Sequence, residues 1–279
     1  MTRPVPTPDE FASADDAIAR HRDELKKRFP LPVPTKRPKR RDPVTLGVLV
    51  TALGLAGGLA WLDPAYQTEQ FGSSLGQRQT IELEDGSSIT LDGGSRVTVS
   101  WHLRTRQVEL QAGQALFEVA PALYRPFKTL AGSTEITVVG TRYNVNRVQD
   151  DVRVTVEEGK IDVRGHDAGL LLLPGDQVLV RNGRLGRPVQ VDANSVAAWT
   201  EGRLVFNRTP LAEVLDVIQR YQQTPIRLDD SGLAELPVSG TFESAHLDRM
   251  LALLPKILPV DLTRADDGTL RLNRRASQE

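Results

Sequence analysis

An uncharged apolar segment of nineteen residues, from Val44 to Leu62, constrains this chain more than any other feature. At 1.5 Å per residue, a helix of that length spans roughly 28 Å, which is close to the hydrocarbon thickness of a bilayer. Basic residues precede it closely: Lys36, Arg37, Lys39, Arg40 and Arg41. Because basic flanks stay on the cytoplasmic side, the sequence predicts a protein that crosses a membrane once, with residues 1–43 inside and everything after Leu62 exported.

The residues leave other interpretations of this segment open. A cleaved signal peptide would be cut near Ala56 or Ala60, but the 43 residues before the segment are many for the basic region of such a peptide. The pair Arg40-Arg41 also fits a weak twin-arginine export signal. A buried core helix is disfavoured by the length and by the basic flank. We favour a retained membrane anchor formed by residues 44–62.

The predicted cytoplasmic segment carries one predicted helix, over residues 9–29. Acidic residues lie near its N-terminal end and basic residues lie near its C-terminal end, which complements the helix dipole. Phe11, Ile18 and Leu25 fall on one face at helical spacing. A single amphipathic helix does not fold alone in water, so we expect this face to bind a cytoplasmic partner. The alternative is a solvated tail that only sets the topology.

Composition excludes several kinds of chemistry. The chain has no cysteine, which removes disulfides and thiolate sites, and its four histidines lie far apart without metal-ligand spacing. We therefore expect no metal and no cofactor. A net charge of −1 gives no field that would attract nucleic acid. The basic cluster before the apolar segment is better explained by topology and lipid headgroups, so we expect no direct contact with nucleic acid.

After the apolar segment, residues 63–190 form a predicted β domain, in which the residues from Gln77 onward show the alternation of apolar and polar residues that is typical of β-strands. The pattern predicts about eleven short strands punctuated by glycines. Gly113, for example, separates the predicted strands Arg106–Leu110 and Gln114–Val119. The expected fold is mainly β, as a stacked or sandwich-like array of short strands.

Residues 191–279 show a different pattern, which predicts a small α/β domain in the order β-α-β-β-α-β-β. Thr209-Pro210 is typical of a helix start, with Thr as N-cap and Pro as the first helical residue. Ser244 is the predicted cap of a second helix. Asp266-Asp267-Gly268 predicts the turn of a closing hairpin.

Several motifs over residues 77–181 resemble, in the same order, the periplasmic part of FecR-type sigma-factor regulators. They are TIELEDGSSITLDGGSRVTV, QVELQAGQALFEVA, RPFKTLAG, ITVVGTRYNV, VTVEEGKIDV and LLLPGDQV. The stretch WTEGRLVFNRTPLAEVLDVIQRYQQTPIRL and the residues after it resemble the STN module, the short domain of secretins and TonB-dependent receptors.

The resemblance implies a single-pass inner-membrane anti-sigma factor or sigma regulator with a cytoplasmic N-terminus and a periplasmic C-terminal region. It implies cell-surface signalling: the periplasmic part contacts the signalling domain of a TonB-dependent outer-membrane receptor, in regulation of iron uptake. The cytoplasmic part binds an extracytoplasmic-function sigma factor, and envelope proteases act on the chain. The chain departs from the family before the span, where it has one predicted helix and no tryptophan.

The resemblance also indicates candidate site residues. Phe11, Ile18 and Leu25 become candidates for sigma-factor binding. For receptor binding, an exposed strand edge or an apolar patch would serve, and the candidates are Phe206, Leu211 and Phe242.

Gly140-Thr141 matches a Gly-Thr pair at which some family members cut themselves. There the threonine hydroxyl attacks the preceding carbonyl in an N-to-O acyl shift, and water then hydrolyses the ester. The alternative is that Gly140 only ends one strand and Thr141 begins the next. We expect no enzyme that acts on an external substrate. The competing function is a membrane-anchored periplasmic scaffold, or envelope-complex component, without sigma-factor contact.

Overall fold

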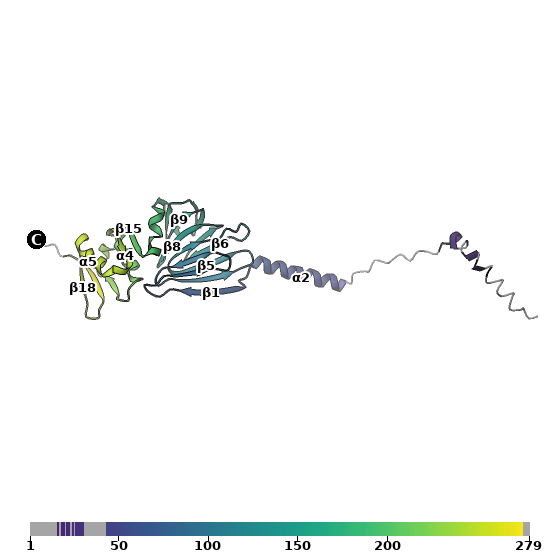
Figure 1. The fold of residues 1–279 in the computed structure, drawn as a ribbon, viewed down its shortest axis with the longest axis horizontal. Coiled ribbons are helices and arrows are strands. Elements are labelled where there is room, and N and C mark those ends of the chain that lie inside the picture. The colour runs from purple at the N-terminus through teal and green to yellow at the C-terminus, as the bar shows by residue number, and fades with distance from the viewer. Residues whose placement is uncertain are drawn as a thin grey trace, which may run out of the picture. The chain divides into compact units, whose positions relative to one another are not determined.

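The computed structural model of the chain describes residues 43–275 and, before them, residues 16, 18–19, 21–22, 24 and 26–30. The description does not include the side chains of residues 43–47, 49–50, 56, 59–60 and 193–194. The chain divides into two compact units, Met1–Leu55 and Ala56–Glu279, which we describe separately. Figure 1 shows the elements along the chain.

The first unit contains the predicted cytoplasmic helix and most of the apolar segment. All described residues from 16 to 28 are helical, Phe29 is a bend, and residues 9–15 of the predicted helix lie outside the described residues. Ile18 is exposed, whereas Phe11 and Leu25 lie outside the described residues.

The helix α2 (Pro43–Leu62) covers the apolar segment and continues into the second unit. Leu62, at its end, is exposed, and the side chain of Val44 is among those not described. When the described residues alone are searched, none of their helices has both the length and the apolarity needed to cross a membrane.

After the end of α2, the second unit continues with the fourteen strands of what we call the β body. They are β1 (Gln67–Gly72), β2 (Gln79–Glu82), β3 (Ser88–Leu91), β4 (Arg96–Trp101), β5 (Arg106–Glu118), β6 (Phe127–Ala131), β7 (Thr134–Val138), β8 (Arg142–Val148), β9 (Asp151–Glu158), β10 (Ile161–Arg164), β11 (Gly169–Leu172), β12 (Asp176–Arg181), β13 (Arg184–Leu185) and β14 (Val189–Gln190).

The strand β5 belongs to two sheets and joins them. Its first half pairs with β4 and β6 in the order β1-β4-β5-β6-β7-β10-β11, and its second half pairs with β3 and β8 in the order β2-β3-β5-β8-β9-β12. The prediction of two separate strands here was wrong. Gly113 does not end a strand: it has φ +87° at the transition, where a Cβ would collide with Ser95.

The two sheets share one hydrophobic core, to which strands of both contribute. Its largest buried side chains include Phe117 and Tyr143, whose rings stack at 5.0 Å between centroids. The Tyr143 hydroxyl is not left unpaired, because it lies 2.6 Å from the Thr129 hydroxyl. The predicted mainly β character of this region is therefore confirmed.

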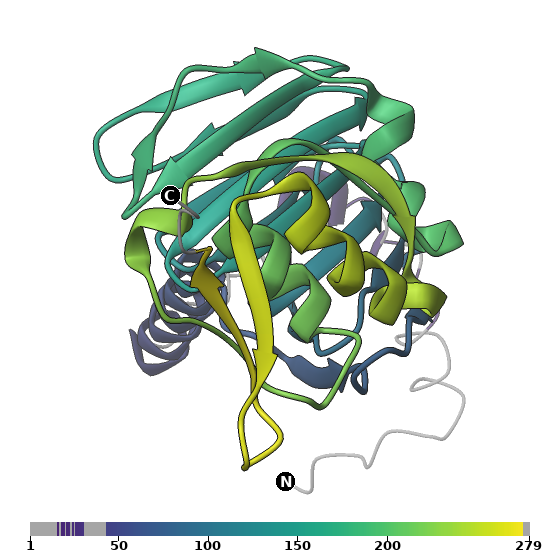
Figure 2. The same cartoon turned by 90° about the vertical axis from the view of Figure 1, so that its left-hand side faces the viewer.

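The remaining elements form the C-terminal domain, which lies in front of the β body in Figure 2. They are α3 (Ala193–Val196), η1 (Ala198–Glu201), β15 (Arg203–Pro210), α4 (Leu211–Gln219), β16 (Ile226–Leu228), η2 (Ser231–Leu233), β17 (Pro237–Glu243), η3 (Ser244–His246), α5 (Leu247–Ile257), β18 (Val260–Arg264) and β19 (Leu270–Arg274). The strands pair as β15-β17 and as β16-β19-β18, and α4 and α5 contribute buried side chains to one core with them.

The predicted order of elements in this domain and its closing hairpin are confirmed, but both helix starts were predicted wrongly. Thr209 and Pro210 belong to β15, where they pair with Val238 and Pro237, and α4 begins only at Leu211. Sheet pairing thus overrides the capping preference of the Thr-Pro pair. Ser244 begins the short 3-10 turn η3, so α5 starts three residues later, at Leu247.

Candidate functional site

A polar surface on the second sheet of the β body faces the C-terminal domain. Alternate residues of β5, β8 and β9 enter the core, so the residues between them lie on the opposite face. Gln114, Asn144, Asn146 and Thr155 lie on that face and are all buried. Strand register brings them together, because Gln114 is opposite Asn146 and Asn144 is opposite Thr155. Buried amides need hydrogen-bond partners, and the C-terminal domain supplies several of them.

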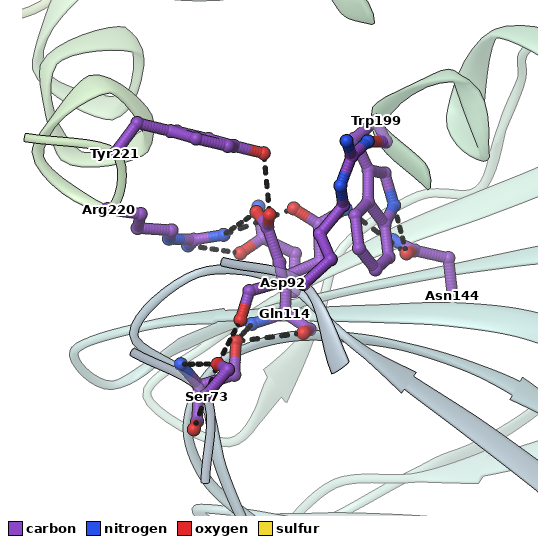
Figure 3. Close-up of polar contacts among 10 residues, drawn as sticks. Ser73, Asp92, Gln114, Asn144, Trp199, Arg220 and Tyr221 are labelled. Carbon is purple, nitrogen blue, oxygen red and sulfur yellow. Dashed lines mark hydrogen bonds and ion pairs between the residues drawn. The ribbon is translucent and has the colours of Figure 1, made fainter. Parts of the chain in front are cut away.

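Arg220, directly after α4, is the central partner. Its Nη1 donates to Gln114 Oε1 at 3.1 Å, and its Nη2 donates to Asn146 Oδ1 at 2.6 Å. Nη1 also lies 3.7 Å from the carboxylate of Asp92, in the turn between β3 and β4. One guanidinium therefore contacts three separate segments of the β body. Figure 3 shows Arg220 directed toward Asp92 and Gln114.

Burial dominates the electrostatics of this ion pair. It lowers the pKa of the Arg220 guanidinium, although the charge of Asp92 opposes that shift. Burial also raises the pKa of the Asp92 carboxyl, against the hydrogen bond from Tyr221 and the charge of Arg220. Each charge is thus costly without the other, because neither is in contact with much water.

The turn that carries Asp92 is packed tightly against the end of α4. The Tyr221 hydroxyl donates to Asp92 Oδ1 at 2.5 Å, and the Ser73 hydroxyl donates to the Asp92 carbonyl. Gly76 N–H donates to the Arg220 carbonyl at 2.8 Å. A Cβ on Gly93 would lie 2.7 Å from that same carbonyl oxygen, so the approach requires glycine.

A second group of contacts involves Trp199, in η1. Its Nε1 donates to Asn144 Oδ1 at 3.0 Å, and Gln114 Nε2 donates to the same oxygen at 3.1 Å. Arg78 Nη1 donates to the carbonyls of Trp199 and Thr200, at 2.6 and 2.7 Å.

We call this arrangement the polar joint. It consists of Asp92, Gln114, Asn144, Asn146, Trp199, Arg220 and Tyr221. A cavity of about 660 Å³ lies beside it, lined by residues that include Asn144, Asn146, Phe206 and Glu213. At one side of the cavity Glu213 forms a two-pronged ion pair with Arg153. Chemically, the joint can hold the C-terminal domain in one orientation on the β body, since its directional bonds need partners from both.

The three receptor-binding candidates lie close to one another in the C-terminal domain but differ in exposure. Leu211 is 0% exposed and Phe206 is 7% exposed, and both belong to the core of that domain. Phe242 is half-buried, with its ring centroid 6.1 Å from that of Phe206. Of these three side chains, only Phe242 presents appreciable surface to a partner. Their receptor-binding role stays a prediction.

Gly140 and Thr141 lie between β7 and β8, which is where the alternative interpretation of the Gly-Thr pair places them. The Thr141 hydroxyl is buried and donates to the carbonyl of Lys160 at 3.1 Å. A Cβ on Gly140 would lie 2.9 Å from the Cα of Pro121. Self-cleavage at this bond stays a prediction.

Within the described part of the chain, no three His, Cys, Asp or Glu side chains lie close enough to hold a metal ion. Sequence reasoning missed the polar joint altogether. Two weak sequence patterns indicate it. Asn144 and Asn146 alternate with buried Val145 in a strand, and Arg220-Tyr221 comes directly after an apolar helix face. Nothing in the sequence shows that these segments meet.

Comparisons with known proteins agree with this architecture. Residues 67–162 match the family model described as FecR protein, and residues 203–270 match the one described as FecR, C-terminal. The first match lies within the β body and the second covers most of the C-terminal domain. A search of curated proteins finds no match.

Two solved structures of a candidate anti-sigma factor from Parabacteroides distasonis are similar in fold. Both have a TM-score of 0.69, with 24% and 25% sequence identity, and the matches cover 75% of this chain and 100% of the other chain. The two family matches come one after the other in chain order and together span more than half of the sequence. Over its β body and its C-terminal domain, the chain therefore belongs to the FecR family.

Proposed function

We propose that the chain is an anti-sigma factor or sigma regulator, which controls an extracytoplasmic-function sigma factor from the inner membrane. The observation that carries this proposal is the pair of FecR-family matches over the β body and the C-terminal domain. The likeness in fold to a candidate anti-sigma factor supports it. Residues 44–62 would span the membrane, with the N-terminus in the cytoplasm and residues 63–279 in the periplasm.

The signal in this proposal comes from the signalling domain of a TonB-dependent outer-membrane receptor, for example one for iron carriers. The C-terminal domain, as an STN-like module, would bind it. Phe242 and the outer edge of β18 are the surfaces we favour for such a contact, since among the described strands β18 pairs with β19 alone. The polar joint would pass a displacement of α4 to the β body, because Arg220 connects them.

Across the membrane, we infer that the helix over residues 9–29 binds the sigma factor. Ile18 is exposed, so its apolar side chain is accessible to a partner. Envelope proteases would release the cytoplasmic segment, since one membrane helix transmits poorly as a rigid lever. Iron-uptake genes are the targets that the family resemblance implies.

The test is capture of the sigma factor by the full-length chain. The chain, carrying an affinity tag, is co-expressed with each extracytoplasmic-function sigma factor of the source genome and purified in mild detergent. We expect one sigma factor to co-purify, and Ile18→Asp to abolish its recovery, because a charge on the binding face must be desolvated. Lys27→Ala is the matched control, since at 3.6 residues per turn it lies on the opposite face of the helix.

Failure to recover any sigma factor with the wild-type chain would contradict the proposal and favour the periplasmic scaffold. Equal loss with both variants would show that the helix itself, rather than its apolar face, is needed. The receptor arm is tested separately, by asking whether the purified signalling domain of a receptor binds the same preparation and whether Phe242→Asp weakens that binding.

A further inference from the structure

Large apolar side chains gather on the loops at one end of the β body. Tyr124 is 97% exposed and Leu123 is 80% exposed, in the loop between β5 and β6. Leu103, in the turn between β4 and β5, and Tyr66, just before β1, are also exposed. Side chains of this kind normally point away from water, so a group of four on adjacent loops calls for a partner.

Hydrogen bonds show that these loops lie together. Arg125 Nη2 donates to the Tyr66 hydroxyl at 2.9 Å and to the His102 carbonyl at 2.5 Å. One guanidinium thus joins the segment after α2, the β4–β5 turn and the loop of Leu123 and Tyr124. We call the exposed side chains Tyr66, Leu103, Leu123 and Tyr124, with Arg104, the loop surface.

The loop surface is continuous with the end of α2. Arg104 Nη2 donates to the Trp61 carbonyl at 2.9 Å, and the Arg104 N–H donates to Asp63 Oδ1 at 3.1 Å. Trp61 and Leu62 are themselves exposed. Tyr66 comes four residues after Leu62, a span of at most about 14 Å. The loop surface therefore lies next to the end of α2.

Charge on these loops favours an anionic partner. Residues 61–66, 102–105 and 121–126 contain Arg104 and Arg125 and a single carboxylate, Asp63. Asp63 is largely covered and accepts hydrogen bonds from the Arg104 backbone N–H and the Thr105 hydroxyl. Its Oδ2 lies 4.0 Å from Nε of Arg104, whose side chain nevertheless stays 59% exposed. Leucine beside tyrosine and arginine is the combination that suits a membrane interface, where rings sit at the headgroups and cations meet phosphates.

We propose that the loop surface lies on the outer leaflet of the membrane, a contact that rests on the proposed anchoring of the chain by residues 44–62. Leu123, Tyr124 and Leu103 enter the boundary between headgroups and acyl chains. Arg104 interacts with anionic phospholipid headgroups. The β body is then held against the bilayer at a fixed end rather than tethered freely by one helix.

The absence of cysteine from the chain makes a clean test possible, since single cysteines can be labelled with a polarity-sensitive fluorophore. The full-length chain carrying Leu123→Cys is placed in nanodiscs of phosphatidylcholine and phosphatidylglycerol, with or without brominated acyl chains. We expect a blue-shifted emission that brominated lipid quenches. Ile257→Cys, exposed on α5 in the C-terminal domain, is the matched control and should show neither effect.

A third label separates this inference from the proposed anchoring. Trp61→Cys reports on the end of α2 itself and should be quenched whenever the helix is inserted. Quenching at position 61 but not at position 123 would refute the membrane contact of the loop surface and leave the proposed anchoring by residues 44–62 intact. No quenching at either position would refute both proposals. A blue shift at 123 without bromine quenching would mean that protein covers the surface, and it would also overturn the proposal.

The role of charge is tested with Arg104→Gln in the same nanodiscs. One arginine near an anionic surface contributes about 1 kcal/mol, so we expect the ratio of docked to undocked label at position 123 to fall about fivefold. In nanodiscs of phosphatidylcholine alone, the variant and the parent should give the same ratio. Equal ratios in both lipid compositions would refute electrostatic docking.

Discussion

Replacing Arg220 by methionine tests whether the polar joint fixes the C-terminal domain on the β body. Methionine keeps much of the side-chain volume but removes the guanidinium, which leaves the 0% exposed Asp92 without its ion-pair partner. It also leaves Gln114 Oε1 and Asn146 Oδ1 without a donor. Removing one partner of a buried ion pair costs about 3–5 kcal/mol, and we expect the free energy of unfolding to fall by that amount.

The assay is urea unfolding of the full-length chain in detergent, monitored by far-UV circular dichroism and by tryptophan emission, to which Trp199 in the joint contributes. Arg203→Met is the matched control, because Arg203 forms an exposed ion pair with Glu201 at 2.7 Å. Exposed pairs contribute little, so this change should stay within about 0.5 kcal/mol.

A double-mutant cycle decides the physical cause. If the loss in Arg220→Met arises from an uncompensated buried carboxylate, then adding Asp92→Asn should recover about 1 kcal/mol or more relative to the sum of the two single changes. Strict additivity of the two changes would refute a direct interaction between Arg220 and Asp92. A loss no larger than that of Arg203→Met would refute the joint as a stabilising contact.

Two further predictions concern pH and self-cleavage. Because burial raises the pKa of Asp92 above its ordinary 3.8, the folded chain takes up this proton before the unfolded chain as pH falls. Asp92 thus adds stability as pH falls from neutral to about pH 4. In urea unfolding over that range, the free energy of unfolding of the wild type should rise relative to that of Asp92→Asn. A difference between the two that does not change with pH would contradict this. If the Gly140–Thr141 bond cleaves itself, the purified chain incubated alone should give two fragments that meet there. Thr141→Ser should keep this reaction and Thr141→Val should lose it, and an uncut wild-type chain would refute it.

Local patterns in the sequence predicted most elements of the second unit, because strand alternation and helix faces depend on neighbours along the chain. The hairpin over Asp266-Asp267-Gly268 and the apolar face of α4 are examples. The errors arise where distant pairing decides the outcome. Thr209-Pro210 has the chemistry of a helix start, yet its pairing with β17 extends β15 through it. Gly113 lies inside one strand because β5 changes partners there.

The candidate site could not be predicted for the same reason. Asp92 and Arg220 are separated by more than a hundred residues, and they lie in two different stretches of the family resemblance, neither of which indicates that the two side chains meet. What brings them together is the packing of α4 against the β3–β4 turn, where Gly93 and Gly76 allow the backbones to approach. Phe206 and Leu211 illustrate the converse: their apolar character suited a surface patch, but they are core residues, because a small domain with two helices needs them inside.

The structure of the polar joint bears on how a signal would leave the C-terminal domain. An apolar interface tolerates small sliding motions, because dispersion contacts are non-directional. The joint does not, since Arg220 meets Asp92, Gln114 and Asn146 through bonds of defined geometry. A shift of α4 by the length of one hydrogen bond would leave a buried charge and two buried amides unpaired together, which makes the attached and detached states distinct rather than graded. A receptor that binds the C-terminal domain would therefore act on the β body by biasing that equilibrium, and only to the extent that it binds the two states with different affinity.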